Sequence, residues 1–424
     1  MKKLLFTIQW YPSYKSPNVY CDTNIMNALL ATGKYEIHCL VYKPYNRPSE
    51  EMLDGFHIHR FKRSWLFDAA MKADAAPDLF KSKLVRKLAR LFMRLKQIVF
   101  VPIYPIYEPL LVRKFQREAV RLHRKEHFDL VISEHNGTDT LLAGYAVKKY
   151  DKSVKYLPVF WDSLSGGFCP HYLPKWFARY GKRQLEKKVM GLADKAIVME
   201  STRSFHQKKM DSVGYGYKFE YANLPKIVAS KEKEDTCVNK ILRKDVINIV
   251  YAGSLTQRHE KYIINLLCGI GHLINLIFFV DVEFYNRLKQ YCEKFDNFKM
   301  EGYLPHNEMI SVLSKADFLL NLGNQNQNDV QSKVFEYISL GKPIISTTNI
   351  DNEASTKFLS KYPLSIIVDE RLPQEENQGN LLMFIKENLK KEMLFKDVVN
   401  IFPNCSPDKY VEIIERLIDG RKQH

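Results

Sequence analysis

The sequence predicts an α/β protein made of two doubly wound units, each a parallel sheet with helices on both faces. Short apolar runs of strand length alternate with longer amphipathic segments, which is the pattern of a parallel sheet and its crossover helices. A charged stretch at 226–245 divides this alternation into two series. The length of 424 residues suits two or more domains of ordinary size.

The first series lies before the charged stretch. Its strand candidates are apolar runs, at 4–10, 35–42, 56–61, 128–135, 154–161 and 194–200. Helices are predicted near 20–32 and 138–150. Together these elements predict one Rossmann-like domain over 1–225.

The second series begins at 247. Its strand candidates lie at 247–254, 276–282, 298–303, 317–323, 343–348 and 365–369. Helices are predicted near 259–271, 284–294, 306–315, 330–340, 377–391 and 406–421. The sequence thus predicts a linker over 226–245 and a second Rossmann-like domain over 246–404. It also predicts a terminal helix within 405–424, which either stays with the second domain or crosses back to the first. Ligands of such sheets bind beyond the carboxyl ends of the strands.

Composition excludes several other classes of protein. Hydrophobic residues make up 46% and charged residues 26%, as in soluble globular proteins, which argues against a disordered chain. The seven cysteines are spread singly without a C-x-x-C pair, so we expect reduced cytosolic thiols. The N-terminal MKKLLFTIQWYPSY predicts a first strand rather than a signal peptide. No apolar stretch is long and uninterrupted enough to predict a membrane-spanning helix.

The most informative segment is 323–347, GNQNQNDVQSKVFEYISLGKPIIST. Asp329 is the predicted N-cap of a helix, and Gly341 fits its C′ position. A helix N-terminus that follows a polar loop presents unpaired N–H groups and a partial positive charge, which suit a phosphate. Lys333 and Glu336 share one face of this helix, where the simplest interpretation is a surface ion pair.

The small polar loop, the S-K-x-x-E-Y sequence and the following G-K-P-I-I resemble the donor-binding segment of GT-B glycosyltransferases, especially the retaining family-four group. The resemblance implies two Rossmann-like domains that face each other across a cleft. It also implies that Glu336 binds both ribose hydroxyls of a sugar nucleotide, and that the loop before the helix touches the donor sugar and the diphosphate. On physical grounds, the helix N-terminus near Asp329 to Ser332 would supply positive charge to the diphosphate, and Lys333 would either reach a phosphate or hold Glu336 in place. The first glutamate of the family's paired motif corresponds to Asn328, with Asp329 beside it, so the sequence departs from the family there.

The resemblance continues in the same order over nearly the whole chain. The segment NIVYAGSLTQRHEKYIINLL looks like the family's strand, glycine turn and helix at the diphosphate, and FKMEGYLPHNEMISVLSKADFLLNL is similar to the segment that frames the base. YANLPK resembles a short asparagine motif before the domain crossover. The donor candidates from these segments are Gly253, Ser254, Arg258, Lys261, Gly302, Tyr303 and Leu304.

Candidates for the acceptor side and for catalysis follow strands of the first domain. Glu134 and His135 end one predicted strand, and Asp162 follows the next, although polar residues at strand ends are often only loop caps. The resemblance adds Ser16 and Asn18, which lie where the family usually has a glycine pair. The catalytic candidates are Asp162, Asn328 and Asp329.

Two patterns raise the question of a metal. Asp281 and Glu283 mimic the acid-x-acid site of the other glycosyltransferase architecture, an alternative that the two-domain pattern disfavours. His57 and His59 share one strand face, but without a third ligand they are interpreted as a surface or partly buried pair. We therefore expect no metal and no other cofactor besides the sugar-nucleotide substrate.

The charge of the chain is concentrated in one segment. Of a formal net charge of +16, a net +11 lies in 81–125, which holds thirteen lysines and arginines against two glutamates. Leucines at 84, 88, 91 and 95 and the isoleucine at 98 step along one helical face. The segment predicts a basic amphipathic helix, either a domain helix with a solvated polar face or a surface that docks on an anionic membrane.

The resemblance implies a metal-independent, retaining GT-B glycosyltransferase that moves a sugar from a nucleoside diphosphate sugar to a saccharide or lipid-linked saccharide. The expected setting is assembly of a surface polysaccharide such as a capsule, with the protein cytoplasmic and peripheral on the inner face of the plasma membrane. Two alternatives stay open: a non-catalytic sugar-nucleotide-binding partner subunit of the same fold, and a nucleic-acid-binding protein. The basic segment carries no nucleic-acid recognition signature, so no nucleic acid is expected as partner.

Overall fold

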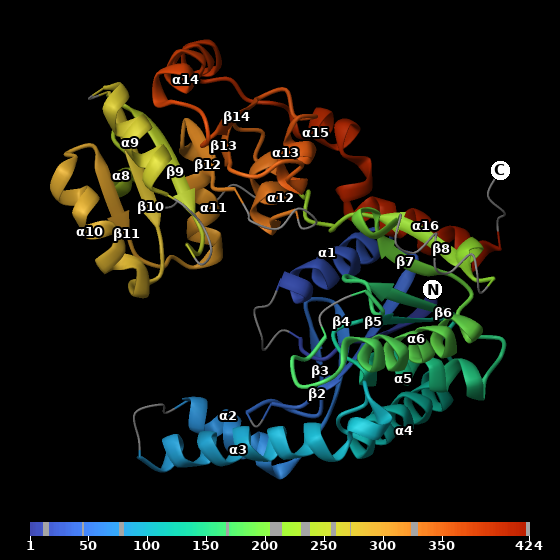
Figure 1. Ribbon diagram of the computed structural model, residues 1–424. Helices are drawn as coiled ribbons and strands as arrows, with labels where there is room; N and C mark the ends of the chain where they lie inside the picture. The colour runs from blue at the N-terminus through green and yellow to red at the C-terminus, as the bar shows by residue number, and fades with distance from the viewer. Residues whose placement is uncertain are drawn as a thin grey trace. The chain divides into compact units, whose positions relative to one another are not determined.

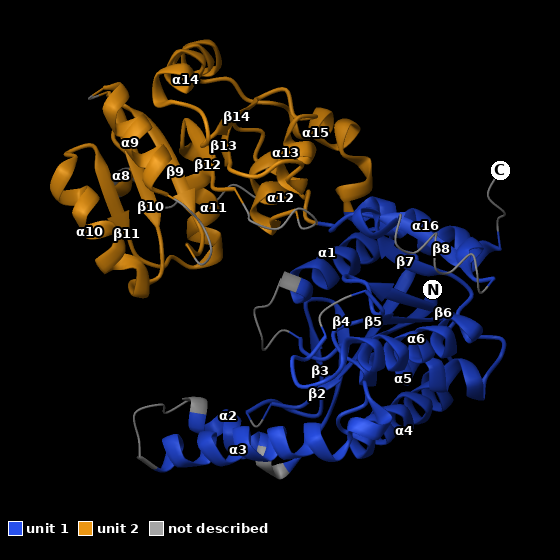
Figure 2. Ribbon diagram, viewed as in Figure 1, with its two compact units in different colours: residues 1–225, 407–424 blue, residues 226–406 orange. Residues whose placement is uncertain are grey.

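A computed structural model describes residues 1–11, 17–44, 46–75, 80–166, 169–203, 214–229, 238–255, 260–271, 273–323 and 330–420. The chain forms two compact units (Figure 2). Unit 1 comprises 1–225 together with 407–424, and unit 2 comprises 226–406. The predicted linker, 226–245, belongs to unit 2. The last helix of the chain belongs to unit 1, so unit 2 is inserted in the sequence of unit 1.

Unit 1 is built on an eight-stranded sheet in the order β3-β4-β2-β1-β5-β6-β7-β8 (Figure 1). All neighbouring strands are parallel except β3 and β4, which pair antiparallel. The strands are β1 (Lys2–Thr7), β2 (Tyr35–Tyr42), β3 (Glu50–Leu53), β4 (Phe56–Phe61), β5 (Leu130–Glu134), β6 (Lys155–Phe160), β7 (Ala196–Met199) and β8 (Phe219–Ala222). The order of the strands reverses between β1 and β5.

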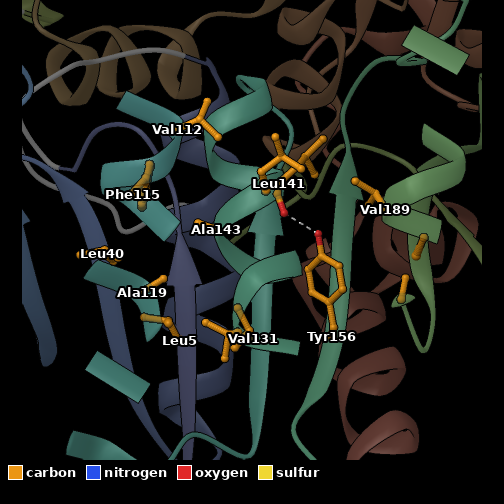
Figure 3. Packing of buried hydrophobic residues seen from close by; sticks show 14 of the residues in the cluster. Leu5, Leu40, Val112, Phe115, Ala119, Val131, Leu141, Ala143, Tyr156 and Val189 are labelled. Atoms are coloured by element: carbon orange, nitrogen blue, oxygen red, sulfur yellow. Dashed lines mark hydrogen bonds between the residues drawn. The ribbon is translucent and has the colours of Figure 1, made fainter. Parts of the chain in front are cut away.

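Two apolar clusters cover the two faces of this sheet. Side chains from α4, α5 and α6 form one cluster with the strands, and Figure 3 shows part of it, with the Tyr156 hydroxyl donating to the Leu141 carbonyl oxygen at 2.8 Å. The first and last helices of the chain, α1 and α16, supply the other cluster. The helices are α1 (Pro17–Ala31), α2 (Trp65–Ala75), α3 (Phe80–Val99), α4 (Pro109–Glu126), α5 (Thr138–Tyr150), α6 (Lys175–Leu192) and α16 (Pro407–Asp419).

Unit 2 is built on a six-stranded parallel sheet in the order β11-β10-β9-β12-β13-β14. Its strands are β9 (Ile247–Ala252), β10 (Ile274–Phe279), β11 (Phe298–Glu301), β12 (Phe318–Asn321), β13 (Ile344–Thr348) and β14 (Ser365–Asp369). Its helices are α8 (Val238–Ile241), α9 (Lys261–Ile270), α10 (Tyr285–Lys294), α11 (His306–Lys315), α12 (Ser332–Ser339), α13 (Ala354–Leu359), α14 (Gln374–Asn388) and α15 (Phe395–Ile401). The predicted α/β class with two parallel-sheet, Rossmann-like domains is confirmed.

Two strands of unit 1 were not predicted, and both lie at edges of its sheet. β3 has the sequence EEML and exposes alternate residues, so it lacks the apolar run that marks the other strands. β8 has the sequence FEYA, in which Glu220 interrupts the apolar run. Strand prediction therefore failed where acidic residues break the apolar pattern.

Candidate functional site

The reversal of strand order in unit 2 lies between β9 and β12. In open parallel sheets the ligand crevice lies at this switch point, beyond the carboxyl ends of the strands. Gly253 and Ser254 follow β9, and Gly323 follows β12. The predicted donor residues from these two segments therefore flank the position where the topology places a ligand.

α12 begins next to this switch point, and its boundaries are set by identifiable residues. Val334, Phe335, Tyr337 and Ile338 are buried and hold one face of the helix against the sheet. Gly341 has φ +70°, the left-handed conformation that glycine adopts without strain, and a Cβ there would collide with the Met393 backbone, so its predicted C′ position is confirmed.

The start of α12 differs from the prediction. The helix begins at Ser332, two residues later than expected, and its N-cap residue is Gln331 rather than Asp329. Gln331 is buried, and its side-chain amide donates to the Leu322 carbonyl oxygen at 2.7 Å instead of capping the helix. No side chain of the described residues caps this end, so its first N–H groups lack a side-chain acceptor there.

A tyrosine joins α12 to the end of β9. The Tyr337 hydroxyl accepts from the Ala252 backbone N–H at 3.1 Å and lies 3.4 Å from the Ala252 carbonyl oxygen. On the other side of the switch point, the Gly323 N–H donates to the Thr347 hydroxyl at 3.0 Å. A Cβ at Gly323 would come within 2.6 Å of the Thr347 carbonyl oxygen, so only glycine fits there. The Tyr337 contact fixes α12 beside the end of β9, and the Gly323 contact holds the end of β12 against β13.

Glu336 lies among positively charged side chains of unit 2. Its carboxylate lies 2.9 Å from the Lys333 ammonium and 3.6 Å from that of Lys226, and its side chain is 17% exposed. Burial by itself raises the pKa of the Glu336 carboxyl, but the charges of Lys333, Lys226 and His306 outweigh it and hold the pKa below its usual value. Glu336 is therefore an ionised, half-enclosed acceptor held in one position by two lysines.

Lys226 was not singled out from the sequence, although it ends the YANLPK segment that was. Its side chain is only 6% exposed, which is rare for a lysine without an acidic partner. Its partner is Glu336, in a distant part of the sequence, so the local pattern gives no sign of the pair.

The other donor candidates lie at the same edge of the sheet or outside the described residues. Lys261 is the first residue of α9 and is exposed. Gly302, Tyr303 and Leu304 follow β11, where the Tyr303 side chain is 73% exposed. Directly after this loop, His306 is close enough to Glu336 to lower its pKa. Arg258, Asn328 and Asp329 lie outside the described residues.

The strand order of unit 1 reverses between β1 and β5, and the predicted acceptor residues gather there. The Asn18 side-chain amide, on α1, donates to the Asn136 side chain just after β5. Glu134, the last residue of β5, is 1% exposed and accepts from the Trp161 indole N–H at 2.6 Å. Ser16 lies outside the described residues. The structure thus brings together Asn18 and Glu134, which the sequence proposed separately.

Asp22 is a member of this cluster that the sequence did not reveal. It is 2% exposed on α1, and burial together with the adjacent Glu134 carboxyl raises its pKa well above the usual value. Burial also raises the pKa of Glu134, although hydrogen bonds from Asp22, Trp161 and Asn18 oppose the shift. Two carboxyl groups this close retain a shared proton at a pH where separate carboxyls are ionised. The pair can therefore both donate and accept.

His135 and Asp162 are neighbours at the same edge. The His135 ring interacts with the Asp162 backbone, and the His135 backbone N–H donates to the Val159 carbonyl oxygen at 2.8 Å. Burial and the positive charge of Lys182 lower the pKa of His135 to about 4, so the imidazole is neutral near pH 7. Asp162 is exposed. A neutral imidazole beside an exposed carboxylate is suited to accept a proton from a hydroxyl.

Asp281 and Glu283, the alternative metal pair, are exposed in and just before a 3-10 turn, η5 (Val282–Phe284), after β10. Among the described residues they form no group of three ligands with another histidine, cysteine or acidic residue.

No family model and no curated protein matches the sequence. Solved structures match over nearly the whole chain. The UDP-GlcNAc 2-epimerase from Methanocaldococcus jannaschii aligns with TM-score 0.56 and 14% identity, covering 97% of this chain and 99% of its own. An α,α-trehalose-phosphate synthase (UDP-forming) from Burkholderia vietnamiensis aligns with TM-score 0.56 and 9% identity, covering 99% and 100%. Anabaena HepE in complex with UDP and glucose aligns with TM-score 0.54 and 11% identity, covering 99% and 100%.

These neighbours are GT-B proteins. The fold of this chain is GT-B. The GT-B fold that the resemblance implied is therefore confirmed. At sequence identities this low, the structural similarity establishes the fold alone. Within the part of the chain that the structure describes, no helix is long and apolar enough to cross a membrane.

Proposed function

We propose that the protein is a glycosyltransferase that uses a nucleoside diphosphate sugar and transfers the sugar, with retention, to a saccharide or lipid-linked saccharide. The observation that carries this proposal is the arrangement around Glu336 at the switch point of unit 2. An ionised carboxylate, fixed by two lysines, lies beside a helix N-terminus and two loops, one of which has room only for glycine at Gly323.

The chemistry of transfer needs positive groups where negative charge develops on the leaving diphosphate. The N–H groups at the start of α12 and the ammonium of Lys333 lie together, and Lys261 starts the helix that follows the other loop of the switch point. These groups supply the charge without a metal ion. Glu336 accepts hydrogen bonds from the two ribose hydroxyls, and Lys226 keeps its carboxylate oriented. Anabaena HepE, which is bound to UDP and glucose, has the same fold, which supports this choice of ligand.

The test is release of nucleoside diphosphate from a panel of sugar nucleotides by the wild type and by Glu336→Ala. Loss of a carboxylate that accepts two hydroxyls costs about 1.5–3 kcal/mol, so we expect a roughly 10- to 150-fold fall in kcat/KM. Glu387→Ala, an exposed glutamate on α14, is the matched control and should leave kcat/KM unchanged.

Before the kinetic test, the donor base is found by measuring which nucleoside diphosphate raises Tm. Unchanged kcat/KM in Glu336→Ala would contradict the ribose assignment. Donor binding without turnover for any acceptor would instead favour the non-catalytic partner subunit. Retention is tested separately, by the anomeric configuration of the product.

We further propose that α3 docks the protein on an anionic membrane, which places it at the cytoplasmic face where lipid-linked acceptors of surface polysaccharides are built. The apolar face of α3 is uncovered: Leu84, Leu88, Leu91, Phe92, Leu95, Ile98 and Val99 are each 45–66% exposed. Seven lysines and arginines lie elsewhere on the helix, and no acidic residue lies within it. An apolar stripe flanked by cations complements a surface of acyl chains and anionic headgroups.

Exposed aromatic side chains lie on α6, which packs against the segment that follows α3. Residues 101–107 pack with the start of α6 through Tyr104, Leu173 and Ala178. On that part of α6, Trp176 is 73% and Tyr180 61% exposed. Tryptophan and tyrosine favour the headgroup region of a bilayer, so these rings extend the docking face.

Vesicle flotation tests the docking proposal. We expect the wild type to float with vesicles that contain anionic lipid, and less so at high salt, because each basic residue near the surface contributes about 1 kcal/mol. The double variant Leu88→Glu/Leu91→Glu should lose flotation, whereas Leu382→Glu, at an exposed leucine of unit 2, should not. Binding to duplex nucleic acid in a gel shift, without binding to anionic vesicles, would overturn the proposal.

A further inference from the structure

Three histidines and a glutamate meet on one face of the unit 1 sheet. They lie toward the amino ends of the strands, whereas the candidate acceptor residues lie at the carboxyl ends. Glu36 and His38 lie on β2, and His57 and His59 lie on β4, with His38 directly paired to His57 in the parallel register. Glu36 is the second residue of β2 and His57 the second of β4, so the group lies at the amino ends of these strands. Glu134 and its neighbours lie at the carboxyl edge of the same sheet.

The geometry of Glu36, His38 and His57 suits a metal ion. The Nε2 of His38 lies 2.7 Å and the Nε2 of His57 3.7 Å from the same carboxylate oxygen of Glu36. The two rings stack with centroids 4.5 Å apart and planes 12° apart, and one ligand atom from each of the three residues lies within 4.8 Å of the others. Ligands at 2.0–2.1 Å from a tetrahedral zinc lie about 3.3 Å from one another. Shifts of a few tenths of an ångström to about an ångström, together with rotation of one of the two stacked rings so that both Nε2 lone pairs point at the ion, complete the site.

A count of protons in the hydrogen-bonded chain points the same way. His38 Nδ1 lies 3.0 Å from His59 Nε2, and His59 Nδ1 lies 3.6 Å from the Glu50 carboxylate. In the order Glu36, His38, His59, Glu50, three pairs of neighbouring groups each need one proton to form a hydrogen bond. The two neutral imidazoles supply only two protons. The geometry leaves the buried Nδ1 of His59 without a hydrogen-bond partner.

A cation at His38 Nε2 resolves this shortage. It removes the need for a proton between His38 and Glu36, so the Nδ1–H of His38 can donate to His59, and the Nδ1–H of His59 then faces Glu50. Such a hydrogen bond from the second ring nitrogen is the usual companion of a metal-bound histidine. His38 is 2% exposed, and a metal ion binds imidazole in its neutral form.

The surroundings admit and attract a cation. A cavity of about 300 Å³ is lined by Glu36, His38, His57 and His59 together with Glu50, Glu51, Lys125 and Glu126. His57 is 39% and Glu36 26% exposed, so an ion can reach both from solvent. Lys3 lies 3.5 Å from Glu36 but only 2.8 Å from Glu126, so it keeps a carboxylate partner if Glu36 turns to a metal.

We propose that Glu36, His38 and His57 bind one divalent transition-metal ion of the zinc class, with water as the fourth ligand. Imidazole with one carboxylate selects zinc, cobalt or nickel over magnesium and calcium, which prefer oxygen ligands. The ion joins β2 to β4 near the open edge of the sheet. It lies at the opposite edge from the candidate acceptor residues and takes no part in sugar transfer, so its role is to stabilise the edge of unit 1.

Titration of the full-length, chelator-treated protein with Co²⁺, followed by visible absorption, tests the site without reference to activity. We expect one equivalent to bind with the spectrum of a four-coordinate ion and to be displaced by Zn²⁺. Zn²⁺ should also raise Tm in a concentration-dependent way. Mg²⁺ should do neither.

His57→Gln is the decisive variant because this side chain is half-exposed and its loss leaves the core intact. We expect it to lose the Co²⁺ spectrum and the Zn²⁺ shift in Tm while its circular dichroism stays that of the wild type. Glu36→Gln should weaken Co²⁺ binding at least tenfold, and His171→Gln, at an exposed histidine outside the cluster, should change nothing. Equal Co²⁺ binding by His57→Gln and His171→Gln, or no saturable binding by the wild type, would overturn the proposal.

Discussion

Helices α3 and α4 are neighbours in the sequence, both basic and both amphipathic, yet they use their apolar faces in opposite ways. α4 lies against α5 and the sheet, and its Val112, Phe115 and Ala119 are buried in the cluster of Figure 3. α3 has α2 alongside (Figure 1), and its leucine stripe faces outward. An amphipathic pattern therefore predicts that one face of a helix is buried against an apolar partner. Only the tertiary structure shows whether that partner belongs to the same protein.

The segment between the two helices explains how they part. The sequence pattern predicted one basic amphipathic segment over 81–125, but a 3-10 turn, η1 (Val101–Ile103), and the prolines at 102, 105 and 109 divide it into two helices. Glu108 then holds both sides together, with its carboxylate bonded to Arg63 and, at 2.7 Å, to Lys96 near the end of α3. The net charge of the segment is therefore shared by a helix of the core and a helix of the surface.

Among variants that compare the two helices, Phe115→Ala in α4 should cause the largest loss of stability. Phe115 is fully buried and packs against the rings of Phe61 and Tyr42, so its truncation should cost about 3–5 kcal/mol of the free energy of unfolding. Urea denaturation followed by circular dichroism measures this loss. A cost below about 1 kcal/mol would show that α4 is not part of the core.

Glu108→Gln should have an intermediate effect. Burial raises the pKa of Glu108, but Arg63 and Lys96 lower it further, so the net pKa lies below its usual value of 4.5. The ionised group thus contributes stability that is fully present above pH about 4.5 and is lost as pH falls through the lower folded value. We expect Glu108→Gln to lose about 1–2 kcal/mol at pH 7 and to show a smaller fall in stability on acidification.

The matched control is Glu118→Gln, since Glu118 forms an exposed pair with Arg121 on the same helix. That variant should keep the stability of the wild type within about 0.5 kcal/mol and keep its pH profile. Identical profiles for Glu108→Gln and the wild type would contradict the bridging role of Glu108.

The smallest expected effect on stability belongs to α3. Leu88→Ala/Leu91→Ala removes two side chains that are 52% and 54% exposed, so the free energy of unfolding should change by less than about 0.5 kcal/mol. Denaturation in parallel with Phe115→Ala compares the two helices directly. A loss as large as that of a buried leucine, about 2 kcal/mol, would mean that protein, rather than membrane, covers this face.

The sequence predicted the fold better than the contacts of the site. Buried strands and the helix around Glu336 carry strong local patterns, and so the parallel sheets, the Lys333–Glu336 pair and the glycine at the end of α12 were all accessible from the sequence. The start of α12 was misplaced because the buried Gln331, which bonds to Leu322, competes with a standard cap.

Long-range partners could not be predicted. Lys226 pairs with Glu336 from a distant part of the chain, and Asp22 meets Glu134 from a helix whose sequence is mostly apolar. The same limit applied to His57, which was judged to lack a third ligand until the register of β2 and β4 brought Glu36 and His38 beside it. Such groups depend on strand order, which periodicity does not specify.

The return of α16 to unit 1 has a consequence for how the chain folds during synthesis. Tyr410, Ile413 and Ile414 complete the apolar cluster with Cys21 and Ile25 of α1. A ribosome makes the α1 side of that cluster long before the α16 side, so the part of this face that α16 covers stays exposed while all of unit 2 is made. The hydrophobic core of unit 1 is therefore completed only after unit 2 has been synthesised.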